Sequence, residues 1–230
     1  SPEYLFEKGF LVETKRIFFI FFFIVFFLIL HLDPSLIIKP QQFLEAMGFV
    51  RNAIKEIEPH DSEERFRSLG VNVIREYGRF LDKKTIAAGD YEIKSRRIVI
   101  ATGAHTSAPE IKGLSDFQYY TNKTIFDLAS KPEHLLVLGG GPVGVEIAQA
   151  FARIGIDATI FEKQEILSNF SDEQVTIVRE NLIDDGVNLR EEACVKDVAN
   201  VGGKLFVQLE NGEKIMGSHL LVATGKKPNL

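Results

Sequence analysis

The sequence has a single cysteine, no surplus of positive charge and no closely spaced histidines. One cysteine, Cys194, excludes an intrachain disulfide, a Cys-x-x-Cys redox pair and a cysteine zinc site. Lysine plus arginine number 27 against 32 aspartate plus glutamate, and this acidic balance argues against a nucleic-acid-binding protein. The histidines show no pair at metal-ligand spacing, and no Gly-x-Ser-x-Gly motif is present. We therefore predict no metal site and no serine-hydrolase centre.

The chain is long enough for one large domain or two small ones, and its amino-terminal part is dominated by an apolar run. Ile17–Leu30 contains only apolar residues, among them seven phenylalanines, and follows Lys15 and Arg16. As a helix this run is about 21 Å long, and snorkelling of its basic neighbours brings it close to a minimal membrane span. We predict an anchor helix over about residues 15–32, with its amino end cytoplasmic.

Two other interpretations of this run remain open. A run of 14 apolar residues is also compatible with a buried core segment. It has the length of a signal-peptide core as well, although no small-x-small cleavage site follows it. In the anchor interpretation, the run would be an anchor or the first transmembrane helix of a membrane-associated protein whose remaining residues we expect on the cytoplasmic side.

The next part of the sequence changes from helical to strand periodicity. Apolar residues from Phe43 to Ile57 recur every three or four positions and stop before Pro59, which predicts a helix. Short β-type runs then predict a small antiparallel meander, with strands at Val71–Ile74, Lys84–Ala87, Tyr91–Ile93 and Arg97–Ala101.

A strand–loop–helix–strand unit follows. The buried-strand run His134–Leu138 leads into the loop Gly139-Gly140-Gly141-Pro142-Val143-Gly144 and a helix that Gly155 ends. The next strand, Ala158–Phe161, is followed at once by Glu162. A capping box at Ser171 and Gln174 predicts a second helix. The remaining strands are predicted at Val187–Leu189, Cys194–Val198, Lys204–Glu210, Glu213–Met216 and His219–Ala223, with a hairpin turn at Asn211-Gly212.

The glycine loop has the spacing G-x-G-x-x-G in the context that a dinucleotide site requires. Gly139 permits the tight turn, Gly141 lets a pyrophosphate approach the backbone, and Gly144 lets the helix pack closely on the strand. The helix amino terminus offers free N–H groups to the pyrophosphate. Glu162 is placed to accept hydrogen bonds from a ribose diol and to repel a 2′-phosphate, so we predict NAD(H) over NADP(H), although Lys163 beside it weakens that preference. The alternative is a glycine-rich turn that binds no nucleotide.

Other polar features are interpreted structurally. Cys194 lies in a predicted strand without a nearby histidine, so we expect a buried structural thiol. Charge runs such as Arg190-Glu191-Glu192 are interpreted as solvated faces.

Three ordered motifs together resemble the pyridine nucleotide-disulfide oxidoreductases, and most of all their dihydrolipoamide dehydrogenase and mercuric reductase branch. The motifs are the glycine segment Val137–Glu146, Ala101-Thr102-Gly103, and Ala223–Asn229. The resemblance implies an α/β fold in which a Rossmann-like NAD-binding domain interrupts an FAD-binding domain. Residues 1–46 would be an amino-terminal segment with the apolar helix. Residues 47–116 would then be part of the FAD domain, 117–225 the NAD domain and 226–230 the return to the FAD domain.

The resemblance also implies roles for individual residues. Glu146 would lie near the contact between nicotinamide and flavin, and Gly225 would border the NAD site. Val195 would pack beside the adenine, and Thr102 and Gly103 would approach FAD. For each residue, ordinary packing or turn geometry is the alternative.

Several parts of the family pattern are missing from these 230 residues. Residues 1–46 contain no flavin-domain glycine loop, and a C-x-x-x-x-C redox pair is impossible with one cysteine. The second FAD segment and the domain that makes the family homodimeric would lie beyond Leu230. We therefore expect an incomplete chain that binds NAD(H), holds FAD weakly or not at all, and contains no assigned catalytic residue. In the intact enzyme a hydride would pass from NADH to flavin. The alternatives are a membrane-tethered NAD(H)-binding module and an inactive truncated reductase.

Overall fold

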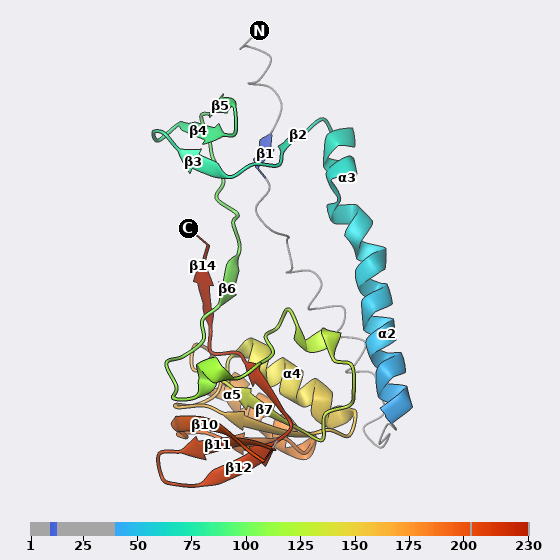
Figure 1. Ribbon diagram of the computed structural model, residues 1–230, viewed down its shortest axis with the longest axis vertical. Coiled ribbons are helices and arrows are strands. Elements are labelled where there is room, and N and C mark those ends of the chain that lie inside the picture. The colour runs from blue at the N-terminus through green and yellow to red at the C-terminus, as the bar shows by residue number, and fades with distance from the viewer. Residues whose placement is uncertain (1–9, 13–39, 203, 230) are drawn as a thin grey trace. The chain divides into compact units, whose positions relative to one another are not determined.

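The computed structural model describes residues 10–12, 40–202 and 204–229 (Figure 1). These residues divide into two compact units, one containing Ala53–His105 and the other Thr106–Lys227. Helix α2 (Pro40–Ile57) contributes its residues up to Asn52 to the second unit. Its boundaries confirm the helix that was predicted to stop before Pro59, and the buried Phe43, Met47 and Val50 confirm its apolar face.

The first unit contains short helices and small sheets. Helix α2 is followed by the 3-10 turn η2 (Glu58–Asp61) and by α3 (Glu63–Ser68). Ser62 caps α3 by accepting the Arg65 N–H, as expected for serine at this position. The strands of this unit are β1 (Phe10–Val12) paired in parallel with β2 (Asn72–Ile74), and the antiparallel meander β3 (Gly78–Phe80), β4 (Thr85–Ala88) and β5 (Tyr91–Lys94).

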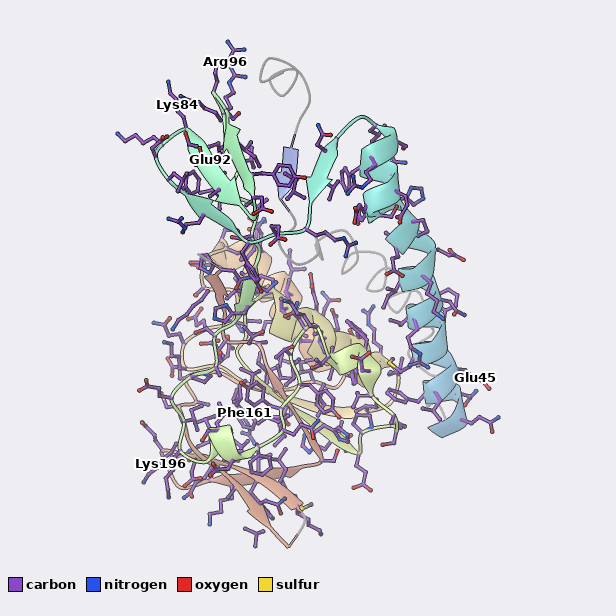
Figure 2. All side chains as sticks on the ribbon, turned by 45° about the horizontal axis from the view of Figure 1, so that its top comes forward. Glu45, Lys84, Glu92, Arg96, Phe161 and Lys196 are labelled. Atoms are coloured by element: carbon purple, nitrogen blue, oxygen red, sulfur yellow. The ribbon has the colours of Figure 1, made fainter. Side chains whose placement is uncertain are left out.

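The observed meander shares two of its strands with the predicted one. The strand predicted at Val71–Ile74 is present as β2, but it pairs in parallel with β1 instead of joining the meander. The strands predicted at 84–87 and 91–93 are confirmed as β4 and β5, whereas β3 was not expected. The strand predicted at Arg97–Ala101 is wrong: these residues are not in a strand, and Val99 and Ile100 are 87% and 57% exposed. An apolar run becomes a strand only when it joins the hydrogen-bond ladder of a neighbouring strand, and residues 97–101 belong to none of the sheets that the structure describes. Lys84, Glu92 and Arg96 project outward from the meander (Figure 2).

A four-stranded parallel sheet forms the centre of the second unit. Its strand order is β13 (His219–Val222), β7 (His134–Leu138), β8 (Asp157–Phe161) and β9 (Asn188–Arg190). Leu135–Leu138 are at most 2% exposed, because layers cover both faces of the sheet. Helices α4 (Pro142–Arg153) and α5 (Asp172–Asp184) make the crossovers between parallel strands. This arrangement confirms the predicted Rossmann-like α/β fold.

A second, antiparallel sheet covers one face of the parallel one. It consists of β10 (Val195–Val201), β11 (Lys204–Leu209) and β12 (Lys214–Gly217), as the hairpin at Asn211-Gly212 predicted. Leu136 and Leu138 of β7 pack against this sheet in one hydrophobic cluster. Val137 points to the opposite face, where α4 lies (Figure 1). Phe161 lies within the packed interior of this unit (Figure 2).

Two short strands lie at the two ends of segment 106–227. Strands β6 (Ala104–Thr106) and β14 (Lys226–Pro228) form a two-stranded sheet that was not predicted. The larger segment of the second unit begins at Thr106, whereas the domain boundary expected from the family resemblance lies after residue 116. Those domain boundaries stay predictions.

The segment predicted as a membrane anchor, residues 15–32, lies outside the described residues. In the part of the chain that the structure describes, no helix has both the length and the apolarity needed to cross a bilayer. The anchor therefore stays a prediction from sequence.

Candidate functional site

The turn between β7 and α4 depends on glycine at its first position. Gly139 has a φ of +104°, and a Cβ there would lie 2.7 Å from the carbonyl oxygen of Ala223. The Gly139 N–H donates to the carbonyl oxygen of Phe161 at 2.9 Å, which ties the turn to the end of β8. A side chain is excluded both by this backbone conformation and by the neighbouring chain.

The last glycine of the loop sets the distance between helix and strand. A Cβ on Gly144 would overlap the carbonyl oxygen of Gly139 and would lie 3.3 Å from Cγ1 of Val137. Helix α4 can therefore approach β7 this closely only with glycine at position 144. The prediction of close helix–strand packing at this residue is confirmed.

The middle of the loop is open, in contrast to its two ends. No atom lies within 4 Å of the position of a Cβ on Gly141, so nothing in the protein requires glycine there. Gly141 is the N-cap of α4, with Pro142 at the first helical position and a first helical bond from the Val145 N–H at 3.0 Å. The N–H groups of Val143 and Gly144 consequently have no acceptor within the helix. Bare backbone beside free N–H groups is the environment that a pyrophosphate requires, so these residues fit a dinucleotide.

The predicted acidic partner lies at this loop. Glu162 follows β8 and is half-buried, and its Oε2 accepts a hydrogen bond from the Gly140 N–H at 2.8 Å. Its Oε1 accepts from the Gln164 N–H at 3.1 Å. A carboxylate has about four acceptor positions, so Glu162 retains capacity for ligand hydroxyls. Lys163 beside it is exposed.

Glu146 is half-buried in α4, just beyond the helix's first turn. Burial, which disfavours the charged form, raises the pKa of this carboxyl to about 7. Glu146 is therefore a proton-binding group near neutral pH within the helix that begins at the glycine loop.

The other residues to which the family resemblance assigns a role in cofactor binding lie in several different elements. Val195 begins β10 and packs against the hydrophobic cluster between the two sheets. Gly225 is exposed with a φ of +113°, and its carbonyl oxygen accepts from the Ser107 N–H at 3.0 Å. Thr102 and Gly103 lie in the first unit and are held by a residue of the last motif. The Asn229 side chain donates a hydrogen bond to the Thr102 carbonyl oxygen at 3.0 Å, and the backbone N–H of Asn229 donates to the Gly103 carbonyl oxygen at 3.0 Å.

Two structural interpretations of polar residues were wrong. Cys194 is exposed and precedes β10, because that strand begins one residue later than predicted. Glu191 is not on a solvated face: it accepts from the Ile166 N–H at 2.8 Å and binds Arg179 through both carboxylate oxygens. The partners of Glu191 belong to other elements, so local charge patterning contained no signal for them.

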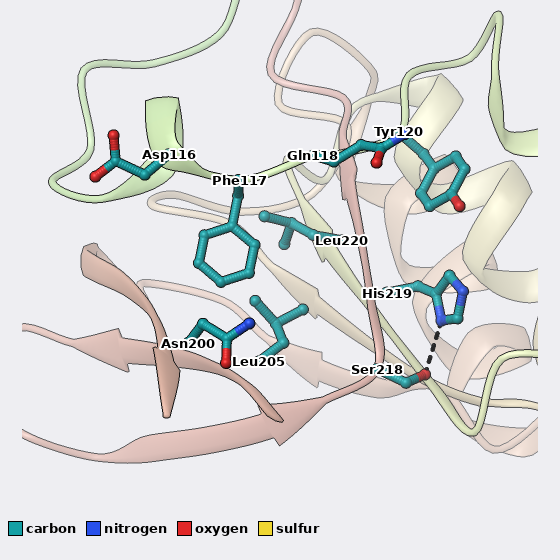
Figure 3. A pocket seen from close by; sticks show the side chains of 9 residues that line it. All are labelled: Asp116, Phe117, Gln118, Tyr120, Asn200, Leu205, Ser218, His219 and Leu220. Carbon is teal, nitrogen blue, oxygen red and sulfur yellow. Dashed lines mark hydrogen bonds between the residues drawn. The ribbon is translucent and has the colours of Figure 1, made fainter. Parts of the chain in front are cut away.

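A shallow pocket of 340 Å³ lies at the sheet edge opposite the glycine loop, where β13 begins (Figure 3). His219 stacks on Tyr120 with ring centroids 5.7 Å apart, and its Nδ1 forms a 2.9 Å hydrogen bond with Ser218 Oγ. Burial lowers the pKa of His219, so the neutral imidazole is favoured. Phe117 lies on the other side of β13 in Figure 3, and the sequence indicated none of these residues.

The fold and the glycine loop define a Rossmann-like α/β class of protein, and sequence comparison identifies the family. A profile of the pyridine nucleotide-disulphide oxidoreductases matches residues 32–230. The chain therefore belongs to this family, whose complete members use FAD and a pyridine nucleotide.

Individual relatives differ in their described activities. The mercuric reductase of Lysinibacillus sphaericus is 33% identical over 162 residues, which are 69% of this chain and 30% of that protein. An NAD(P)H dehydrogenase (quinone) of Mycobacterium tuberculosis H37Rv is 28% identical over 181 residues, 74% of this chain and 37% of the relative. The chain thus spans about a third of the length of the curated relatives it matches.

Solved structures show the same fold at low sequence identity. The Cu(II) complex of the flavoprotein disulfide reductase RclA from Escherichia coli superimposes with a TM-score of 0.77 at 24% identity, covering 96% of this chain and 51% of that one. LpdA from Mycobacterium tuberculosis gives 0.75 at 20% identity, covering 96% and 53%. At these identities the comparison establishes the fold alone.

Proposed function

We propose that this chain is the NAD(H)-binding portion of an FAD-dependent pyridine nucleotide-disulfide oxidoreductase. The observation that carries the proposal is the geometry of the glycine loop. Gly141 has open space around it and lies between Gly139 and Gly144, where a side chain would clash, and the Glu162 carboxylate accepts the N–H of Gly140. Family membership supports the proposal independently.

The residues of the loop would hold the dinucleotide in complementary ways. The pyrophosphate would bind the unsatisfied N–H groups of the first turn of α4, where the helix dipole favours negative charge. The remaining acceptor positions of Glu162 would bind the ribose diol, and its charge would repel a 2′-phosphate. The bound nicotinamide supplies the hydride.

The other assignments are extensions of this proposal. Glu146 would lie near the nicotinamide, where its pKa near 7 lets it hold or release a proton at neutral pH. Val195 and Gly225 would border the same nucleotide, and Thr102 and Gly103 would approach FAD in the intact enzyme. The hydride would pass from NADH to that flavin.

A membrane attachment is proposed separately for the amino-terminal part. The uninterrupted apolar run Ile17–Leu30 after two basic residues supports a membrane attachment of the amino-terminal part. In that arrangement the chain would be a tethered NAD(H)-binding module even without turnover.

Calorimetric titration of the full chain with NADH and with NADPH tests the proposed function. We expect NADH to bind more tightly than NADPH. Gly141→Ala adds a Cβ in open space, so it should keep the melting temperature nearly unchanged while weakening NADH binding about tenfold or more. Gly48→Ala in α2 is the control and should leave binding unchanged. A chain that does not bind NADH, or a Gly141→Ala variant that binds it normally, contradicts the proposal.

A further inference from the structure

The segment that follows β8 binds both polar backbone groups of Gly140. Glu162 Oε2 accepts the Gly140 N–H at 2.8 Å, and the Leu167 N–H donates to the Gly140 carbonyl oxygen at 2.9 Å. Between these two residues, Ile166 is fully buried, and its Cγ2 lies 2.7 Å from where a Cβ on Gly140 would be. Segment 162–167 therefore clamps the glycine loop at Gly140.

This segment depends on support from outside itself. Leu167 has a φ of +50°, a conformation that a non-glycine residue adopts only when its surroundings hold it there. The support comes from the connection between β9 and β10. Glu191 Oε1 accepts the Ile166 N–H at 2.8 Å, and the Glu192 N–H donates to the Gln164 carbonyl oxygen at 3.0 Å.

Glu191 is held in turn by a residue of α5. Arg179 binds it with two nearly parallel hydrogen bonds, Nε to Oε2 at 2.7 Å and a terminal nitrogen to Oε1 at 2.9 Å. Hydrogen bonding to Arg179 lowers the pKa of Glu191, and the same pairing raises the pKa of Arg179. Both groups stay charged at physiological pH, and a bidentate pair fixes orientation as well as distance.

We propose that Arg179 and Glu191 are positioning residues of the nucleotide site. They hold segment 162–167 so that the Glu162 carboxylate stays on the glycine loop. They thereby set the affinity for NADH and the discrimination against NADPH without touching the nucleotide. This inference rests on the proposed function of the same site.

Asp185, the C-cap of α5, supplies a matched control. Asp185 also accepts two side-chain hydrogen bonds through one carboxylate, from Arg153 Nε at 2.8 Å and Gln149 Nε2 at 2.6 Å. The Arg153–Asp185 pair is more buried than the Arg179–Glu191 pair. Asp185 has no hydrogen bond to segment 162–167, so its removal affects stability without disturbing the clamp.

The test titrates the full chain and its variants with NADH and NADPH and measures each melting temperature. Glu191→Ala and Arg179→Met should bind NADH about tenfold more weakly, since hydrogen bonds to charged groups are lost, and should discriminate less against NADPH. Glu191→Gln keeps an oxygen that accepts the Ile166 N–H and should recover much of the affinity. Asp185→Ala should lower the melting temperature. The Kd of each nucleotide should stay within about twofold of its value in the unmodified chain, which is a smaller change than the loss of a hydrogen bond causes.

Amide hydrogen exchange keeps the inference testable if Glu191→Ala does not fold. Exchange in residues 162–167 should accelerate in Arg179→Met and not in Asp185→Ala. Normal NADH binding with an unchanged NADH/NADPH ratio in the Arg179 and Glu191 variants would overturn this inference and leave the proposed function standing. If the unmodified chain binds neither nucleotide, both fall.

Discussion

The Glu162 carboxylate accepts a hydrogen bond from the backbone N–H of Gly140, over a distance of 2.8 Å. The two residues lie 22 positions apart in the sequence and meet because β7 and β8 are parallel neighbours that end at the same edge of the sheet. One bond thus joins the residue expected to select the ribose to the loop expected to bind the pyrophosphate.

Replacing Glu162 by glutamine should change nucleotide preference. The variant keeps the shape of the side chain but loses the charge, so NADH binding should weaken about threefold to tenfold because charge-assisted hydrogen bonds become neutral ones. NADPH should lose less affinity or gain some, because the repulsion of its 2′-phosphate is removed. Calorimetry with both nucleotides measures the ratio. Lys163→Gln, at an exposed neighbour, should leave NADH affinity unchanged. An unaltered ratio in Glu162→Gln would count against the ribose contact.

Alanine at Gly144 and at Gly48 should have opposite effects on stability. Both residues are in helices, but a Cβ at 144 overlaps the backbone of Gly139, whereas at 48 the nearest atom is 3.8 Å away on a flexible arginine. Gly144→Ala should lower the free energy of unfolding by about 2–3 kcal/mol through overpacking. Gly48→Ala should raise it by about 0.5–1 kcal/mol because alanine is the better helix former. Denaturant titration measures the free energy of unfolding of both variants. Equal changes in this free energy would show that α4 can move away from β7.

Glu146 should make the stability of the chain fall as pH rises. Its pKa is about 7 in the folded chain against 4.5 for the ordinary group, so between these values the folded state binds the proton more tightly. The stabilisation from the neutral carboxyl is complete below about pH 4.5 and is lost as pH rises through about 7. At pH 8, Glu146→Gln should therefore raise the free energy of unfolding by about 1–2 kcal/mol, allowing for solvent screening of a half-buried group.

The measurement is denaturant unfolding at several pH values. Glutamine at position 146 stays neutral, so its advantage over glutamate should be present at pH 8 and absent at pH 4. The exposed Glu210 provides the control, since Glu210→Gln should shift stability equally little at both. A Glu146→Gln effect that is the same at pH 4 and pH 8 would show that packing, and not proton binding, accounts for it.

Cys194 should react readily in the folded protein. It is exposed and is the only cysteine, so a colourimetric thiol reagent should modify one group per chain without denaturant. The rate of modification should rise only modestly when the protein unfolds, because the reagent already reaches the thiol in the folded protein. Cys194→Ser supplies the blank. Modification that requires denaturant would mean that the thiol is covered in solution.

Local sequence features predicted most of the second unit. Strand β7, the glycine turn, α4 and β8 were located to within about a residue, because an apolar run, a glycine and a proline each act on their own backbone. The roles of Gly139 and Gly144 also follow from backbone sterics that any strand–turn–helix of this type shares. Glu162 was found by spacing alone, since a parallel crossover returns the chain to the same edge of the sheet.

Contacts between distant segments were beyond the reach of such patterns. Residues 97–101 have the composition of a strand but not its pairing, and β3 has the pairing with little of the composition. The clamp on Gly140 required α5, the β9–β10 connection and segment 162–167 to meet, and the charge run that contains Glu191 was predicted to be a solvated face. By itself the sequence determined the position and the shape of the glycine loop. Only the tertiary structure decided what holds that loop in place, because a hydrogen bond between remote residues leaves no periodicity in the chain.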